Sequence, residues 1–184
     1  PVLEDHDFVT ERGEPVGALY GFLRTLLMVL REYPSRYVAV ALDAGGVTVR
    51  HEAYAGYKAT RKPTPEPLAQ QLPRVPEVLK AFGIPCLLVP GYEADDVMAT
   101  LSWEAERTGI PVLHLTGDKD IAQLMSDTVK LLRPGRRPGD PFTMLDRAEV
   151  EEKFGVPPER IPDLLALEGD ASDNVPGVTE IGEK

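Results

Sequence analysis

Apolar residues recur three and four positions apart in two long segments, residues 15–31 and 94–107, and this spacing predicts an amphipathic helix over each of them. Residues 66–82 also have the content of a helix. Pro73 and Pro76 must kink or divide that helix, because proline removes an amide donor and its ring clashes with the preceding turn.

Short apolar runs alternate with these helices and predict strands. They are YVAVALDA (37–44), IPCLLVP (84–90), the start of PVLHLTGDKD (111–120) and residues 128–132. Runs of this length that are apolar throughout are typical of strands buried on both faces of a parallel sheet. The alternation therefore predicts an α/β fold with a mostly parallel central sheet flanked by helices.

The pattern changes after residue 146, where short helical segments are separated by proline and glycine. The segments are RAEVEEKFG and PPERIPDLLALEG, and a turn at DNVPGV follows them. We therefore expect an α/β core over residues 1–146 and a small helical region over residues 147–184.

The composition fits a globular chain in a reducing compartment. Hydrophobic residues make up 42% of the 184 residues, and no apolar run approaches the roughly 18 residues that would span a membrane. The single Cys86 excludes an intramolecular disulfide and a cysteine zinc site. We expect a cytoplasmic monomer that has no membrane partner.

The formal net charge is −10, which argues against a protein that coats nucleic acid by bulk attraction. It does not argue against a protein that brings divalent metal ions to nucleic acid, because carboxylates that hold metals count as negative in this sum. The positions of the charges therefore matter more than their total.

Acidic residues follow three successive predicted strands. In an open parallel sheet these strand ends meet at one edge, where ligands usually bind. The first turn of a helix also favours acids, so the GYEADD cluster alone has an ordinary structural explanation. The acids at the three strand ends are Asp43, Glu93, Asp95, Asp96, Asp118 and Asp120.

So many carboxylates at one edge would raise each other's pKa values, at about 1.36 kcal/mol per unit, unless a cation relieves the repulsion. Oxygen ligands without nearby cysteine or histidine favour Mg²⁺ or Mn²⁺ over Zn²⁺. Asp170 and Asp173 in LEGDASDN lie between two helical segments and could complete such a site from the other side.

Residues 49–63 form a basic stretch with interleaved tyrosines. A helix over this stretch would place five of its residues on one face, at spacings of three and four. Such a face suits a phosphate backbone with an unpaired base to stack, although a solvated surface helix is the alternative. The five residues are Arg50, Tyr54, Tyr57, Lys58 and Arg61.

Taken in order, these motifs resemble a known family. LDA, RHEAYAGYKATR, VPGYEADD, LTGDKD, GDASDN and VPGVTEIGEK resemble the 5′ nuclease domain of bacterial DNA polymerase I, within the flap endonuclease family. The resemblance extends from about Phe8 to the last residue. It implies a PIN-like 5′ nuclease fold whose C-terminal helical region contains the start of a helix–three-turn–helix.

The resemblance also implies a role for each matching residue. Arg50, Tyr57, Lys58 and Arg61 match the helical arch that handles a 5′ single strand, and Lys58 and Arg61 would act in catalysis at the scissile phosphate. The metal-binding carboxylates would be Asp43, Glu93, Asp95, Asp96, Asp118, Asp120, Asp170 and Asp173.

The motif at the C-terminal end implies a contact with duplex DNA. Backbone amides near Gly177 and Gly182 would hold a duplex phosphate, usually together with a monovalent cation such as K⁺. Lys184 lies in the same motif and joins the expected DNA-binding residues.

The implied reaction is the hydrolysis of DNA phosphodiester bonds at 5′ ends or flaps in replication and repair. Two or more divalent ions would take part, and the partner would be DNA with 5′ ends or flaps. Family members begin with a strand that ends in Asp-Gly, and nothing before RGEPV supplies it. We therefore expect a fragment that lacks this first strand and ends inside the helix–three-turn–helix. It would come from a longer nuclease or polymerase and would have weak or no activity alone.

Other interpretations stay open at this point. An aspartyl phosphatase would use one nucleophilic carboxylate, whereas here acids converge from several strands. A DNA-structure-binding module without catalysis and an RNase-type nuclease are further alternatives. For single residues the structural expectation is simpler: Met98, Trp103 and His114 belong to the core, and Asp146 caps a helix.

Overall fold

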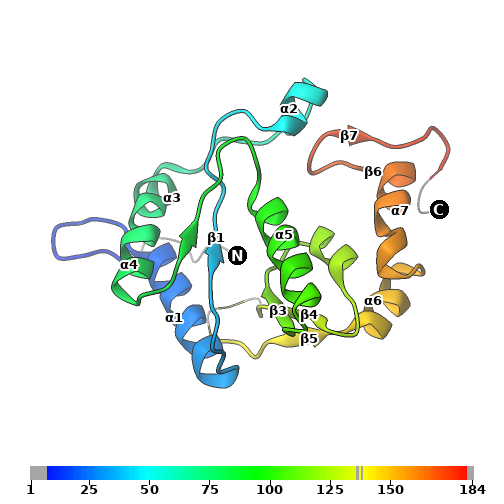
Figure 1. The fold of residues 1–184 in the computed structure, drawn as a ribbon. Helices are drawn as coiled ribbons and strands as arrows, with labels where there is room; N and C mark the ends of the chain where they lie inside the picture. Colours follow the sequence, from blue (N-terminus) through cyan, green and yellow to red (C-terminus); the bar gives the residue numbers. More distant parts are fainter. Residues whose placement is uncertain (1–7, 136, 138, 182–184) are drawn as a thin grey trace. The chain divides into compact units, whose positions relative to one another are not determined.

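The structure, a computed structural model, describes residues 8–135, 137 and 139–181 (Figure 1). The chain forms two compact units. Unit 1 contains Pro1–Val40, Pro63–Leu87 and Pro134–Phe142, and unit 2 contains Ala41–Lys62, Leu88–Arg133 and Thr143–Lys184. Both units draw on segments that are far apart in the sequence, and the division at residue 146 stays a prediction.

Unit 1 is built on the helices that the sequence predicts. Helix α1 spans Gly17–Glu32, and the proline-containing segment is divided into α3 (Glu66–Gln71), a 3-10 turn η2 (Leu72–Arg74) and α4 (Val75–Ala81). This confirms the predicted break. The buried Gln71 side chain accepts a hydrogen bond from the Leu19 amide at 3.1 Å, so it ties α3 to α1.

The strands are shorter than predicted and do not form one central sheet among the described residues. Strand β1 (Val40–Ala41) pairs with β2 (Cys86–Leu87), and each has only two residues. Tyr37, near the start of the first run, is exposed, and Pro85, beside β2, has no amide to donate.

A separate three-stranded sheet lies in unit 2. Strand β3 (Val112–Leu115) pairs in parallel with β4 (Val129–Arg133), and β4 pairs antiparallel with β5 (Thr143–Leu145). The expected parallel pair is therefore present, but the antiparallel strand β5 was not predicted. The prediction of a mostly parallel central sheet is therefore wrong, and the described residues form a mixed α/β fold with small sheets.

Three α-helices and two 3-10 turns pack around this sheet: α5 (Ala94–Arg107), α6 (Arg147–Phe154), α7 (Ile161–Glu168), η3 (Asp120–Leu124) and η4 (Pro158–Arg160) (Figure 1). Their core contains several fully or almost fully buried residues: Ile121, Ala122, Val129, Leu131, Val150 and Ile161. At the start of α6 the Asp146 carboxylate accepts a hydrogen bond from the Glu149 amide at 3.0 Å, which confirms the predicted cap.

Met98 packs against this core as expected, but the prediction for Trp103 is wrong, because Trp103 is 63% exposed. The reason is helix geometry. Five residues at 3.6 per turn place position 103 about 140° around α5 from position 98, which faces away from the core.

No helix in the described ranges combines the length and hydropathy that a bilayer crossing requires.

His114 is a core histidine, as the sequence predicts. It lies on β3, is 6% exposed, and its Nε2 is 2.6 Å from the Ser102 hydroxyl of α5. Burial lowers the pKa of His114 from 6.5 to about 4. The neutral form therefore fits the folded state, and the unfolded chain takes up a proton at a higher pH.

The stability of the fold should consequently fall in acid because of His114. The contribution of the neutral ring is fully present above pH 6.5 and is lost as the pH falls toward about 4. The shift corresponds to about 3 kcal/mol. We expect the difference in the free energy of unfolding between the parent and His114→Gln to shrink by about this amount from pH 7 to pH 4, as measured by urea denaturation. A difference in the free energy of unfolding between the two proteins that stays the same at all pH values would contradict this assignment.

Candidate active site

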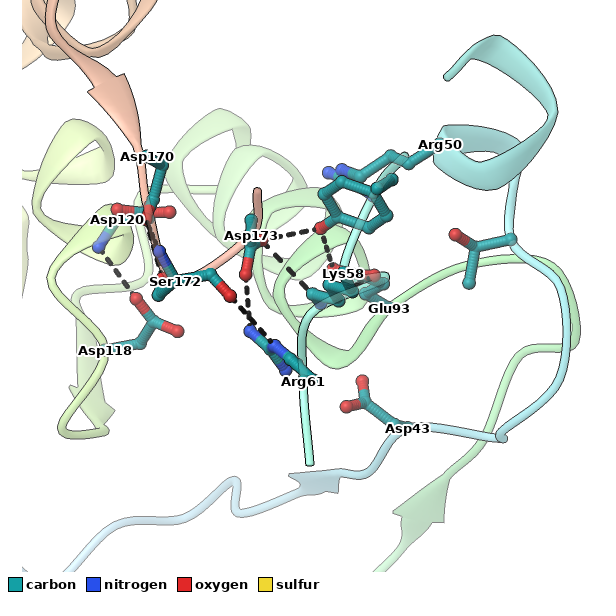
Figure 2. Close-up of polar contacts among 12 residues, drawn as sticks. Asp43, Arg50, Lys58, Arg61, Glu93, Asp118, Asp120, Asp170, Ser172 and Asp173 are labelled. Carbon is teal, nitrogen blue, oxygen red and sulfur yellow. Dashed lines mark hydrogen bonds and ion pairs between the residues drawn. The ribbon is translucent and has the colours of Figure 1, made fainter. Parts of the chain in front are cut away.

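Unit 2 contains a hollow of about 300 Å³ that gathers acidic and basic side chains from segments distant in the sequence. Seven of the eight predicted metal-binding carboxylates line it: Glu93, Asp95, Asp96, Asp118, Asp120, Asp170 and Asp173. The predicted basic and aromatic residues that line it are Arg50, Tyr57, Lys58 and Arg61. Figure 2 shows most of these side chains and the contacts between them.

The start of α5 supplies three of the acids. Gly91, with a φ of 84°, turns the chain after β2, and Glu93 is the residue that precedes the first helical turn. The Asp96 carboxylate accepts a hydrogen bond from the Glu93 amide at 2.9 Å, so it caps the helix. The helix-start explanation for GYEADD and its place in the hollow are therefore both correct.

Among the acids of this cluster, Asp95 is the one whose ionised form its surroundings disfavour most. Burial is the largest cause, and together with the neighbouring charges of Asp118, Asp43, Glu93 and Asp120, in that order, it raises the pKa of Asp95 to about 6. The carboxylates from the three strand ends are thus close enough to disfavour each other's ionised forms.

Asp118 and Asp120 follow strand β3 and are held by a local turn. The Asp118 carboxylate accepts a hydrogen bond from the Asp120 amide at 2.9 Å (Figure 2). Burial, followed by the charge of Asp118, raises the pKa of Asp120. The Oδ1 atom of Asp120 is buried and has no hydrogen-bond partner among the described residues, which is the condition of an oxygen that could accept a cation.

Asp170 and Asp173 lie on the hairpin of β6 (Gly169–Asp170) and β7 (Val175–Pro176). Asp170 accepts hydrogen bonds from the Ser172 amide and hydroxyl and pairs with Lys119 at 3.2 Å. Burial opposes the charge of Asp170, but the Ser172 hydrogen bonds and Lys119 together outweigh it and lower the pKa of Asp170. The hairpin therefore connects to the turn that carries Asp118 and Asp120.

The basic side chains of residues 50–61 pair with these acids. Arg50 forms two hydrogen bonds with Asp96, at 2.7 and 2.8 Å, which raise the pKa of Arg50 and lower that of Asp96. Lys58 pairs with Glu93 at 2.8 Å, and Arg61 pairs with Asp173 (Figure 2).

Tyr57 completes this group from the buried side. Its hydroxyl donates toward Glu93 at 3.0 Å and toward Asp173 at 2.8 Å. Burial, and then the two carboxylates, raise the pKa of Tyr57. The phenol is therefore a neutral donor that links the start of α5 to the β6–β7 hairpin.

The expectation that residues 50–61 share one helical face is wrong. Helix α2 spans only Val49–Ala53, Tyr54 has an extended backbone, and Lys58 has a φ of 54°. Gly56 disfavours a helix, and distant segments satisfy the backbone instead: the Lys58 amide donates to the Asp173 carbonyl at 2.8 Å. The lining side chains still meet in the hollow, because their acidic partners position them.

The described residues Asp43, Tyr54 and Gly177 do not line the hollow. Asp43 accepts a hydrogen bond from the Ala94 amide at 2.8 Å and acts on Asp95 through its charge. Tyr54 is 43% exposed. At Gly177 an added Cβ would lie 2.3 Å from the Glu168 carbonyl, so the close chain crossing requires glycine there. Gly182 and Lys184 lie outside the described residues.

Sequence reasoning missed several residues that line the hollow: Lys119, Ser172, Gln123, Leu124 and Trp103. Lys119 and Ser172 stand inside the GDKD and GDASDN motifs, so their neighbours were a usable signal. Trp103 had no such signal, because an aromatic residue on an amphipathic helix is more often part of the core.

The residues present fit a divalent cation chemically. Among the described residues, no three His, Cys, Asp or Glu side chains form a group that could hold a metal ion as they lie. However, Asp95, Asp118 and Asp120 have no ion pair with a described residue, and one oxygen of Asp120 is buried without a partner. Their oxygen-only chemistry suits Mg²⁺ or Mn²⁺.

Comparisons with known proteins agree with this geometry. Residues 2–155 match the family described as "5'-3' exonuclease, N-terminal resolvase-like domain". The chain is 50% identical over 175 residues to the thermostable DNA polymerase I of Thermus filiformis, covering 95% of this chain and 20% of that protein. It is 43% identical over 175 residues to a 5'-3' exonuclease of Aquifex aeolicus, covering 95% of this chain and 59% of that protein.

A solved structure shows the same fold. The bacteriophage T5 flap endonuclease, in a pseudo-enzyme-product complex with DNA and metal ions, superposes with a TM-score of 0.67 at 26% identity. The match covers 91% of this chain and 63% of that chain.

The repulsion on Asp95 yields a stability prediction. Its folded pKa of about 6 lies above the ordinary 3.8, so ionised Asp95 destabilises the fold above pH 6. In EDTA at pH 7 we expect Asp95→Asn to raise the free energy of unfolding by about 1–2 kcal/mol, after allowance for solvent screening. The gain should disappear below pH 4, where both states are protonated.

The control for this prediction is Asp127→Asn, because Asp127 is exposed and does not line the hollow. Thermal denaturation of both variants, with and without Mg²⁺, separates the effect of the site from a general effect of lost charge. Equal stability of the Asp95 and Asp127 variants in EDTA would show that the repulsion is absent.

Proposed function

This chain belongs to the 5'-3' exonuclease family with the N-terminal resolvase-like domain, and on that basis we propose that it hydrolyses DNA phosphodiester bonds at 5′ ends or flaps with divalent metal ions. The proposal rests above all on one observation. Seven carboxylates and the basic side chains of Arg50, Lys58 and Arg61 line a single hollow. A phosphodiester and its metal ions need both kinds of group in one place.

The carboxylates would hold the cations. We place Asp95, Asp118 and Asp120 at the centre of this set. Neighbouring carboxylates raise the pKa values of Asp95 and Asp120, and the buried Oδ1 of Asp120 has no hydrogen-bond partner among the described residues. The other proposed ligands are Asp43, Glu93, Asp96, Asp170 and Asp173. When bound, Mg²⁺ or Mn²⁺ would make water a better nucleophile at neutral pH and would offset charge on the phosphate and the leaving oxygen.

The basic side chains would bind the phosphate. Lys58 is held over the hollow by Glu93, and Arg61 is held by Asp173, so both start close to the carboxylates. Their donors would stabilise the charge that develops on the phosphate oxygens, which is the catalytic role proposed for them. Arg50, Tyr54 and Tyr57 would contact the 5′ strand.

The relatives support the choice of substrate. The matching T5 flap endonuclease is described with DNA and metal ions, and the Aquifex relative is a 5'-3' exonuclease. The chain spans about a fifth of the length of the DNA polymerase I relatives, covering 20% of the Thermus filiformis protein. A linked polymerase domain and a role in replication and repair are therefore parts of the proposal. So are the duplex contact and the K⁺ site at the segment that begins near Gly177.

A second candidate is a module that binds DNA structures without cutting them. It is favoured by the ion pairs that already occupy Glu93, Asp96, Asp170 and Asp173, and by the absence of a three-ligand metal group among the described residues. Such a module would bind flap DNA equally well with and without divalent metal.

The direct test is cleavage of a labelled 5′-flap substrate by the chain in Mg²⁺. We expect Mg²⁺-dependent cleavage, and we expect Asp118→Asn to lower its rate by about 100-fold or more, because a lost ligand weakens the charge stabilisation of the transition state. Asp127→Asn serves as the control with an equal change of charge. Flap binding in EDTA without any cleavage in Mg²⁺ would instead support the binding module.

Lys58 gives a second prediction. We expect Lys58→Ala to lower kcat by about 100-fold while the Kd for flap DNA changes much less, because its proposed donor acts on the developing charge. Lys80→Ala, at an exposed lysine of α4, should leave kcat unchanged. Single-turnover cleavage and fluorescence anisotropy would measure the two quantities. A change confined to Kd would assign Lys58 to binding alone.

A further inference from the structure

Trp103 is an exposed aromatic side chain beside the charged hollow. Tryptophan is highly buried on average, yet 63% of Trp103 is exposed, and the residue lines the same hollow as the carboxylates. Trp103 does not belong to the core cluster, and it carries no charge that could pair with the acids of the site. An exposed tryptophan in a pocket lining is a frequent feature of recognition sites.

Its position on α5 fixes its relation to the acids. Asp96, Ala99 and Trp103 follow each other at spacings of three and four, so they lie on one face of the helix, and all three line the hollow. Seven residues at 1.5 Å each place Trp103 about 10 Å along the axis from Asp96. The residue between them is an alanine, whose side chain is small, and Trp103 itself is 63% exposed.

Polar and apolar groups of η3 line the same hollow. Gln123 is held by a hydrogen bond from its Nε2 to the Asp120 carbonyl at 2.8 Å, and Leu124 packs against the core. Trp103 therefore shares the hollow with Gln123 and Leu124, which the hydrogen bond to Asp120 and the core packing hold in place.

We infer that Trp103 is a stacking platform for an unpaired base of the DNA strand whose phosphate is held at the carboxylates. This inference rests on the proposed function. An unpaired base presents its π-face to an aromatic ring, whereas bases inside a duplex are already stacked on each other. Because Trp103 and Asp96 lie on one face of the same helix, the stacked base and the phosphate near Asp96 would belong to nearby nucleotides of one strand.

The chemistry of stacking predicts that binding at Trp103 depends little on which base is stacked. Every base has a π-face, and stacking on an aromatic side chain contributes through that face rather than through hydrogen bonds to the base edge. Trp103 would thus recognise an unpaired nucleotide of any sequence, and it would add a preference for single-stranded character to a site that otherwise binds phosphate and metal.

The experiment uses the fact that Trp103 is the single tryptophan of the chain. Its fluorescence is followed while a 5′-flap DNA is added in EDTA, and anisotropy of a label on the DNA reports binding independently. We expect quenching that follows the anisotropy curve. A blunt duplex without unpaired bases should quench much less at equal occupancy.

Substitutions then test the energetic contribution. We expect Trp103→Ala to weaken flap binding by about tenfold, within the 5- to 150-fold range that corresponds to the loss of one stacked base, and Trp103→Phe by less than about threefold. Leu101→Ala is the matched control, because Leu101 is 45% exposed on the same helix and does not line the hollow.

Flap substrates with one abasic position identify the stacked nucleotide. An abasic site at that position should weaken binding by the parent chain but not by Trp103→Ala, and abasic sites elsewhere should affect both proteins equally. This comparison separates stacking from a merely structural effect of the substitution, which would lower affinity for every substrate alike.

The outcomes distinguish the inference from the function on which it rests. If anisotropy shows flap binding while Trp103 emission stays unchanged and Trp103→Ala binds like the parent, the inference is overturned and the proposed function stands. If quenching and the abasic effect are seen without cleavage in Mg²⁺, the inference stands and the catalytic part of the proposal fails. If flap DNA does not bind, both fail.

Discussion

Electrostatic repulsion within a partly buried hollow is the constraint that organises unit 2. Asp95 illustrates its strength, because burial and four neighbouring carboxylates raise its pKa to about 6. A fold that collects this much negative charge must supply positive charge to the same place. The structure does so with side chains at the edge of the cluster, where Arg50, Lys58 and Arg61 pair with Asp96, Glu93 and Asp173. Asp95, Asp118 and Asp120 have no such partner among the described residues.

The same constraint explains why so many contacts in unit 2 join distant segments. The irregular backbone after α2 is held by Lys58, Arg61 and Tyr57 through acids on α5 and on the β6–β7 hairpin. Half-buried and hydrogen-bonded pairs of this kind are costly to break from one side, because the remaining charge stays in a poorly solvated place. The acids that would hold metal ions therefore also position the phosphate-binding side chains.

The sequence predicted the regular elements best where one local signal dominated. Helix α5 begins and ends where its apolar period does, and the prolines divide the α3–α4 segment as expected. The ends of the second and third predicted strands also deliver their acids to one hollow as predicted, whereas Asp43 at the end of the first lies outside its lining. Residues 49–61 show the limit of this approach, because a helical spacing was present but hydrogen bonds to Asp173 and Asn174 hold the chain in another conformation. Trp103 was misplaced for a related reason, since its exposure depends on which face of α5 packs inward.

The distribution of charge also resolves the apparent conflict between a net charge of −10 and a nucleic-acid partner. At physiological ionic strength the Debye length is about 8 Å, so a DNA phosphate interacts mainly with charges within that distance. Acids that lie beyond this distance from a bound phosphate do little to oppose its binding. Within the hollow, the acidic and basic side chains that line it set the net charge that a phosphate meets. A divalent cation bound between the carboxylate oxygens and the phosphate oxygens would attract both and so offset their repulsion. An acidic chain is therefore compatible with binding a polyanion, provided that its densest carboxylates are also the ones with access to metal ions.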